Sequence, residues 1–201
     1  MSSDRPTGLN RVEPRHEWLW LLGAVVVMGV VYAVLASGTT LWDRDEPRFS
    51  RAAVEMLMRG DYVVPWFNGE WRLHKPIMVY WFMAGSMKVL GQTELALRLP
   101  SILGMIVTAL CTYGVGRRMF GVRAARWAFV VLATAVLPIY MGQAATADGV
   151  LNGFIALALL AMVEAVYRGG RWWAWPGVAV GLAGAMLTKG PVGLGVVWLS
   201  A

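Results

Sequence analysis

The strongest constraint on this chain is a series of five apolar stretches, each close to the length that crosses a membrane. They cover residues 18–36, 99–116, 127–143, 149–167 and 172–188. A helix needs about 20 mostly apolar residues to cross the hydrocarbon core of a bilayer, and 58% of the 201 residues are hydrophobic. The sequence therefore predicts an all-α integral membrane protein with five spans, and a sixth that begins at residues 192–199, inside which we expect the chain to be cut off.

The arginines predict how this bundle lies in the membrane. Residues 1–17 carry three of them, and others follow the second span at 117–126 and the fourth at 168–171. Cytoplasmic connections are rich in Lys and Arg, so we expect residues 1–17 to form a cytoplasmic tail and residues 37–98 an outer loop, in which the apolar segment 76–90 lies on the membrane surface. Arginines at span ends also account for the net charge of +6, and we expect no binding to nucleic acid.

The outer loop has predicted structure of its own. From residue 48 to residue 59, charged side chains recur every three or four positions opposite an apolar stripe, which is typical of an amphipathic helix. We expect this helix to begin at Pro47 and to end at Gly60. Further along, the pair Asn68-Gly69 predicts a tight turn.

Three acidic residues in this background are candidates for chemistry. Asp45 and Glu46 precede the helix expected from Pro47, and Asp148 precedes the span expected from Gly149. A carboxylate at the start of a helix often does no more than cap it. At a membrane surface it can also accept a proton from an acceptor hydroxyl, orient an acceptor amine or phosphate, or hold a divalent cation. The residues alone leave these alternatives open.

Basic residues share the same predicted face. Lys75 follows His74 in the outer loop, and Lys189 ends the fifth span. A lysine in such a place binds a lipid phosphate as a point charge, or only extends its ammonium group to the water interface. His74 is a metal ligand or an ordinary polar residue, and the lone Cys111 excludes a cysteine metal cluster. Carboxylates and cations on one face suit group transfer from a lipid phosphate.

Five short motifs follow one another along the chain. They are Asp45-Glu46-Pro47-Arg48-Phe49, Leu73-His74-Lys75-Pro76 with Tyr80-Trp81, residues 94–100, Thr146-Ala147-Asp148, and residues 187–191. In these motifs the chain resembles membrane glycosyltransferases of the GT-C type, in the group that contains protein O-mannosyltransferases and lipid A aminoarabinose transferases. The resemblance implies that residues 18–201 are the N-terminal part of a polytopic helical bundle, whose members continue through more spans and usually a soluble outer domain.

The resemblance also implies an activity and a site. Such enzymes transfer a sugar from a polyprenyl phosphate donor to lipid A, a protein or another envelope acceptor, at the periplasmic face of the bacterial inner membrane. The implied catalytic residues are Asp45, Asp148 and, next, Glu46. The implied substrate-binding residues are Lys75, which lies near the donor phosphate, and Arg48, Lys189 and Tyr80. We expect no required cofactor, with a divalent metal ion at His74 left open.

A second hypothesis comes from another class of protein. The chain could be a truncated, non-catalytic membrane protein or an interaction subunit that keeps these helices without a complete site. This hypothesis predicts stable insertion without sugar transfer. A transporter fragment is disfavoured, because transport sites lie near the bilayer midplane, whereas among the candidate charges only Glu164 lies within an expected span.

Overall fold

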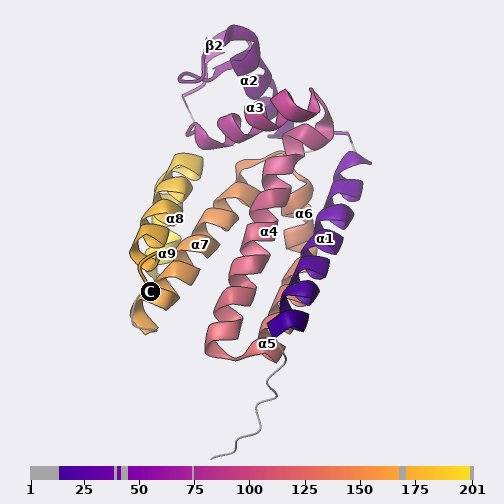
Figure 1. The fold of residues 1–201 in the computed structure, drawn as a ribbon. Coiled ribbons are helices and arrows are strands. Elements are labelled where there is room, and N and C mark those ends of the chain that lie inside the picture. Colours follow the sequence, from indigo (N-terminus) through magenta and orange to yellow (C-terminus); the bar gives the residue numbers. More distant parts are fainter. Residues whose placement is uncertain (1–13, 39, 42–44, 74, 168–170, 200–201) are drawn as a thin grey trace, which may run out of the picture.

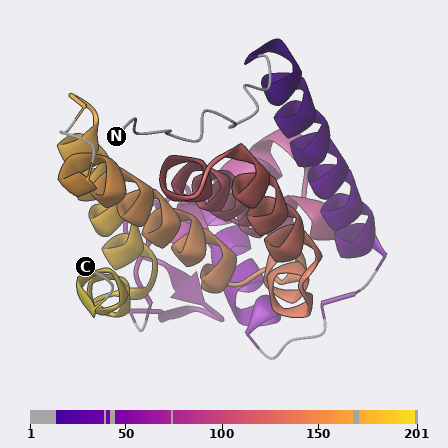
Figure 2. The ribbon, with the colours of Figure 1, turned by 90° about the horizontal axis from the view of Figure 1, so that it is seen from below.

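The computed structural model describes residues 14–38, 40–41, 45–73, 75–167 and 171–199, and shows a helical bundle with a smaller layer across one end (Figure 1). The bundle contains α1 (Pro14–Ser37), α4 (Glu94–Met119), α5 (Val122–Thr134), α6 (Val136–Gln143), α7 (Ala147–Tyr167), α8 (Ala174–Lys189) and α9 (Val192–Leu199). The layer contains α2 (Glu46–Arg59), a hairpin of β1 (Trp66–Phe67) and β2 (Glu70–Trp71), and α3 (Met78–Leu90). Seen from below, α1 and the α8–α9 pair lie on opposite sides of the bundle (Figure 2).

Among the described residues, three helices are long and apolar enough to cross a membrane, namely His16–Ser37, Glu94–Met119 and Ala147–Tyr167. The bent pair of α5 and α6 makes a fourth candidate. Helix α8 has 16 residues, fewer than the roughly 20 that a straight span needs. The predicted helical, multi-pass architecture is confirmed, and the count of five to six spans stays a prediction.

The break between α5 and α6 has a local cause. The sequence predicts one continuous span over residues 127–143, but Ala135 takes an extended conformation (φ −71°, ψ 143°) and the two helices meet at 59°. Pro138 has no N–H to donate to the Thr134 carbonyl, so an unbroken helix would lose a hydrogen bond at this point. A proline in the first turn of a helix is tolerated, and α6 begins two residues before it.

Glycines allow α4 and α7 to pack at backbone distance. A Cβ on Gly104 would lie 2.2 Å from the carbonyl oxygen of Gly149, and a Cβ on Gly153 would lie 2.9 Å from that of Gly104. Close beside them, the Ser101 hydroxyl donates to the Thr146 carbonyl at 3.2 Å. Small residues permit this kind of close helix packing in membrane proteins. The contact fixes the start of α7 against α4.

Replacing Gly104 by Ala should therefore destabilise the bundle. Overpacking costs about 1–3 kcal/mol, which exceeds the gain in helix propensity of at most about 1 kcal/mol that Ala brings. We expect a lower unfolding temperature, measured by circular dichroism in detergent micelles. The matched control is Gly23→Ala in α1, where a Cβ meets no atom within 4 Å. Equal unfolding temperatures for the two variants would contradict the close contact.

The layer across the end is held together by the apolar face of α2. Phe49 and Met56 of α2 are buried in one cluster with Val79 and Met83 of α3. The helix ends at Gly60, which has a φ of +68° and donates its N–H to the Met56 carbonyl. The predicted amphipathic helix is thus confirmed, and the predicted place of residues 76–90 on the membrane surface stays a prediction.

Candidate functional site

Most of the predicted site residues lie at the end of the bundle that carries α2 and α3. Asp45 and Arg48 lie at the start of α2, and Lys75 lies between β2 and α3. Helix α7 begins at this end and α8 ends there (Figure 1). Asp148 in the first turn of α7 and Lys189 at the end of α8 are therefore brought to the same end.

Asp45 presents its carboxylate at the surface. It occupies the N-cap position of α2, where its side chain makes no capping hydrogen bond and its main-chain carbonyl accepts from the Phe49 N–H at 3.0 Å. The carboxylate lies 3.6 Å from the Arg48 guanidinium, and the two side chains are 50% and 42% exposed. Capping therefore does not account for this side chain, and a catalytic role stays open to it.

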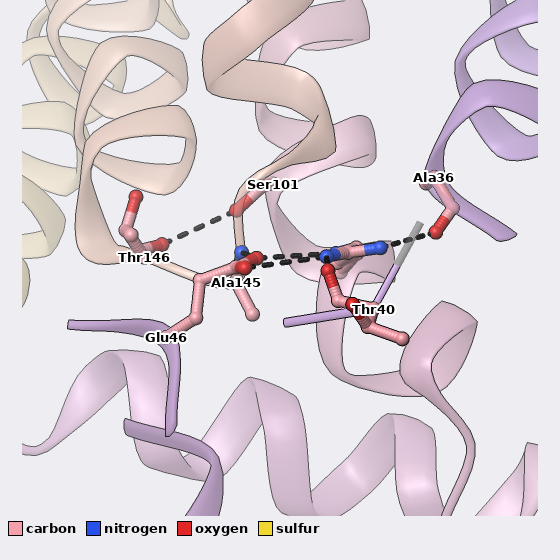
Figure 3. Close-up of polar contacts among 7 residues, drawn as sticks. Ala36, Thr40, Glu46, Ser101, Ala145 and Thr146 are labelled. Carbon is pink, nitrogen blue, oxygen red and sulfur yellow. Dashed lines mark hydrogen bonds and ion pairs between the residues drawn. The ribbon is translucent and has the colours of Figure 1, made fainter. Parts of the chain in front are cut away.

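Glu46 lies inside the protein. It is the first residue of α2, not the residue before the helix as expected, and it is 0% exposed. Its Oε1 accepts hydrogen bonds from Nε of Arg98 (3.1 Å) and from the main-chain N–H of Ala145 (2.6 Å), and its Oε2 accepts from Nη2 of Arg98 (3.2 Å; Figure 3). Both oxygens are engaged in holding other elements. The catalytic role expected for Glu46 stays a prediction, and the geometry favours a positioning role.

Arg98 completes this buried network, and the sequence analysis did not single it out. Its Nη1 donates to the Ala36 carbonyl and its Nη2 to the Thr40 carbonyl at 3.0 Å. Arg98 on α4 thus joins the end of α1, the start of α2 and, through Glu46, the segment between α6 and α7 (Figure 3). One feature of the sequence could have pointed to Arg98: it directly precedes an apolar span, and a charge in such a place needs a partner.

Asp148 and Lys189 form an ion pair between α7 and α8. Nζ of Lys189 lies 2.5 Å from Oδ1 of Asp148, and the side chains are 33% and 39% exposed. Asp148 is the second residue of α7. It therefore does not occupy the capping position before the helix, where the sequence analysis expected it. Lys189 faces Asp148 in this structure, and its ammonium group has three N–H donors, of which Asp148 accepts one.

Tyr80 is hydrogen-bonded to Arg72, a residue that the sequence analysis also did not single out. Tyr80 is 0% exposed, and its hydroxyl accepts a hydrogen bond from Nε of Arg72 at 2.9 Å. Burial raises the pKa of Tyr80, the hydrogen bond and charge of Arg72 oppose this rise, and the negative charge of Asp45 adds to it. Tyr80 is therefore protonated at neutral pH.

The hairpin that precedes Arg72 is fixed to α2 by Glu55. Asn68 (φ +53°) and Gly69 (φ +84°) form the predicted tight turn. The Asn68 N–H donates to Oε1 of Glu55 at 2.9 Å, and Nε of Arg51 donates to the same oxygen at 2.8 Å. Burial alone would raise the pKa of Glu55, but these hydrogen bonds bring it below its ordinary value. Glu55 is ionised at neutral pH and keeps the hairpin in place.

The structure gives no support to a metal centre built from several side chains. Within the described ranges, no group of three or more His, Cys, Asp or Glu side chains converges in a way that could hold a metal ion. His74, the predicted metal ligand, lies outside the described residues. A metal ion at His74 therefore stays a prediction.

The chain is similar in sequence to known membrane transferases. The family described as "Dolichyl-phosphate-mannose-protein mannosyltransferase" matches residues 74–199, more than half of the chain. An undecaprenyl phosphate-alpha-4-amino-4-deoxy-L-arabinose arabinosyl transferase of Serratia proteamaculans is 30% identical over 183 residues, which are 88% of this chain and 33% of the relative. The transferase with the same name in Pseudomonas paraeruginosa is 31% identical over 187 residues, or 88% and 32%. The chain thus spans about a third of the length of these relatives.

Solved structures show the same similarity in fold. ArnT from Cupriavidus metallidurans in the apo state has a TM-score of 0.82 and 26% identity, over 91% of this chain and 35% of that one. The structure of ArnT bound to undecaprenyl phosphate has a TM-score of 0.81 over 88% and 34%. The helical bundle expected from the five motifs is therefore confirmed. The chain belongs to the dolichyl-phosphate-mannose-protein mannosyltransferase family of membrane glycosyltransferases.

Proposed function

We propose that the chain forms the donor-binding part, with catalytic carboxylates, of a glycosyltransferase that moves a sugar from a polyprenyl phosphate to lipid A or another envelope acceptor. One observation carries this proposal: the carboxylate of Asp45 is half exposed beside Arg48, at the end of the bundle where Lys75 also lies. The names of the relatives, which specify undecaprenyl phosphate and aminoarabinose, support it. The family description names mannose, so the proposal leaves the sugar open.

The proposed transfer uses these side chains as follows. The bond between C1 of the sugar and the phosphate oxygen breaks, and its electron pair leaves with the phosphate. An acceptor oxygen forms the new bond to C1 from the opposite face. An acceptor hydroxyl passes its proton to Asp45, whereas an ionised acceptor phosphate has no proton to give, and Asp45 then orients hydroxyl or amino groups by accepting hydrogen bonds. Lys75 and Arg48 stabilise the charge that grows on the leaving phosphate.

The other two acidic candidates take different parts in this proposal. Asp148 is the second carboxylate of the site, and it exchanges Lys189 for a substrate group when the pair between α7 and α8 separates. Glu46 acts by positioning, because its buried bonds to Arg98 and Ala145 fix the start of α2. The residue directly before it is Asp45, so the same bonds fix the proposed base.

An apolar cavity of about 530 Å³ offers space for the polyprenyl chain. Side chains of α3, α4 and α7 line it, including Phe82, Leu103 and Phe154. A polyprenyl chain has no polar group and gains free energy when it leaves water for such a surface. Because α3 follows Lys75 closely in the chain, a tail bound against α3 keeps the donor phosphate near that lysine.

We propose that this end of the bundle faces the periplasm. Two arginines, Arg117 and Arg118, lie at the opposite end in the last turn of α4, and Arg123 and Arg126 lie in the first turns of α5. Short connections rich in arginine stay in the cytoplasm. This orientation gives a cytoplasmic N-terminus and a multi-pass protein of the bacterial inner membrane.

The test is the transfer of radiolabelled sugar from undecaprenyl phosphate donors to lipid A, in membranes that contain this chain. We expect transfer that requires the lipid-linked donor and that occurs where the periplasmic face is accessible, measured in right-side-out and inside-out vesicles. The control supplies the same sugar as a nucleotide sugar, which should give no product. Stable insertion without any transfer, both for this chain and for a full-length protein that contains it, would contradict the proposal and would fit the non-catalytic membrane protein.

A further inference from the structure

We propose that Arg72 is a phosphate-binding residue for the polyprenyl phosphate donor and acts together with Lys75. This inference rests on the proposed function, and it adds a residue that neither the five motifs nor the matched residues 74–199 include. It follows from how the guanidinium is held, from the lack of an ion pair to it within the described residues and from its contact with the start of α2.

The guanidinium of Arg72 is fixed in place before any ligand arrives. Nε donates to the hydroxyl of Tyr80 at 2.9 Å, and the guanidinium carbon lies 5.2 Å from the ring centre of Phe67 and 5.6 Å from that of Phe49. The main-chain N–H of Arg72 donates to the Pro65 carbonyl at 2.8 Å. A preorganised donor loses little conformational entropy when it binds.

Arg72 makes no ion pair within the described residues. Six ion pairs occur in this part of the chain, and Arg72 takes part in none of them. Its side chain is nevertheless half-buried, and a partly desolvated charge is costly without a partner. Lys75 likewise makes no ion pair with a described residue. Two cations three residues apart in the sequence are therefore without an ion pair in this part of the chain.

The position of Arg72 makes a phosphate the fitting anion. Nε is engaged with Tyr80, and the two Nη groups remain as a pair of donors, which matches two oxygens of a phosphate. The guanidinium lies over the ring of Phe49, whose main-chain N–H donates to the carbonyl of Asp45, so the anion bound by Arg72 lies near the start of α2, which carries the proposed base. In sugar transfer, the leaving phosphate occupies this place.

The experiment compares the affinities for undecaprenyl phosphate and for undecaprenol, which lacks the phosphate, in nanodiscs. We expect Arg72→Gln to weaken binding of undecaprenyl phosphate by about 10- to 100-fold, as the loss of charged hydrogen bonds predicts, and to leave undecaprenol binding unchanged. Tyr80→Phe removes only the hydroxyl that holds Nε of Arg72, and it should weaken binding of undecaprenyl phosphate by a smaller factor. The matched control is Arg59→Gln, because Arg59 also lies over an aromatic ring, that of Trp66 at 4.2 Å. This variant should bind both lipids as the unaltered chain does.

A measurement on the unaltered protein guards against a variant that fails to fold. Phenylglyoxal modifies accessible arginines, and we expect undecaprenyl phosphate, but not undecaprenol, to protect Arg72 while Arg59 reacts as before. Equal protection by both lipids, or unchanged affinity in Arg72→Gln, would overturn the inference about Arg72. Neither result would contradict the proposed donor site itself. An unaltered chain that does not distinguish the two lipids would instead overturn the proposed function.

Discussion

Asp45→Asn should lower the rate of sugar transfer by at least about 100-fold, the usual size of the contribution of a general base. Asparagine keeps the shape of the side chain but can neither take a proton nor carry a negative charge. The side chain of Asp45 is half exposed and makes no capping hydrogen bond to α2, so α2 should keep its start. The measurement is the initial rate of transfer in membranes, with binding of undecaprenyl phosphate and the unfolding temperature determined in parallel.

The matched control for this variant is Asp61→Asn. The carboxylate of Asp61 accepts hydrogen bonds from the main-chain N–H groups of Val63 and Val64, which lower its pKa. Asparagine forms the same turn through its side-chain oxygen, so transfer should continue at the normal rate. If Asp45→Asn transferred sugar normally and Asp148→Asn did not, the proposed base would be Asp148 instead.

The parts of the site that could be predicted from the sequence depend on local patterns. The helical period marked α2, the Asn-Gly pair marked the turn, and the length of the apolar stretches marked the membrane helices. The break at Ala135 was missed although Pro138 was visible, because overall hydropathy carries no information on a single missing hydrogen bond.

The two acidic neighbours at the start of α2 show what local patterns leave out. Successive residues of a helix point in directions about 100° apart, as 3.6 residues per turn requires. Asp45 faces outward and Glu46 is buried against Arg98, which lies 52 residues further along the chain. The sequence places both acids at one site, and only the contact of Arg98 on α4 with the start of α2 separates their roles. Arg72 was missed for the same reason, because its contacts come from α2, α3 and the hairpin together.

Arg98→Ala should destabilise the protein by about 3–5 kcal/mol, the usual cost of removing one partner from a buried ion pair. The change leaves the buried carboxylate of Glu46 without its guanidinium and removes the donors to the Ala36 and Thr40 carbonyls. We expect a strongly lowered unfolding temperature in micelles and a low yield of folded protein by size-exclusion chromatography. Arg48→Ala is the control, because its exposed pair with Asp45 should contribute less than about 1 kcal/mol. Similar losses in the two variants would contradict a structural role specific to Arg98.

Exchanging the two charges, by combining Glu46→Arg with Arg98→Glu, should not restore this stability. The fixed backbone groups have a direction: the Ala145 N–H points at residue 46, and the carbonyls of Ala36 and Thr40 accept at residue 98. After the exchange, a guanidinium would meet an N–H group and a carboxylate would meet two carbonyl oxygens, which repel strongly in a medium of low dielectric constant. Combining Glu46→Leu with Arg98→Met should recover only part of the loss, because it removes both buried charges but leaves the same three backbone groups unpaired. A charge-exchanged variant as stable as the original would mean that attraction between the two charges alone holds this end together, without a contribution from the direction of the backbone groups.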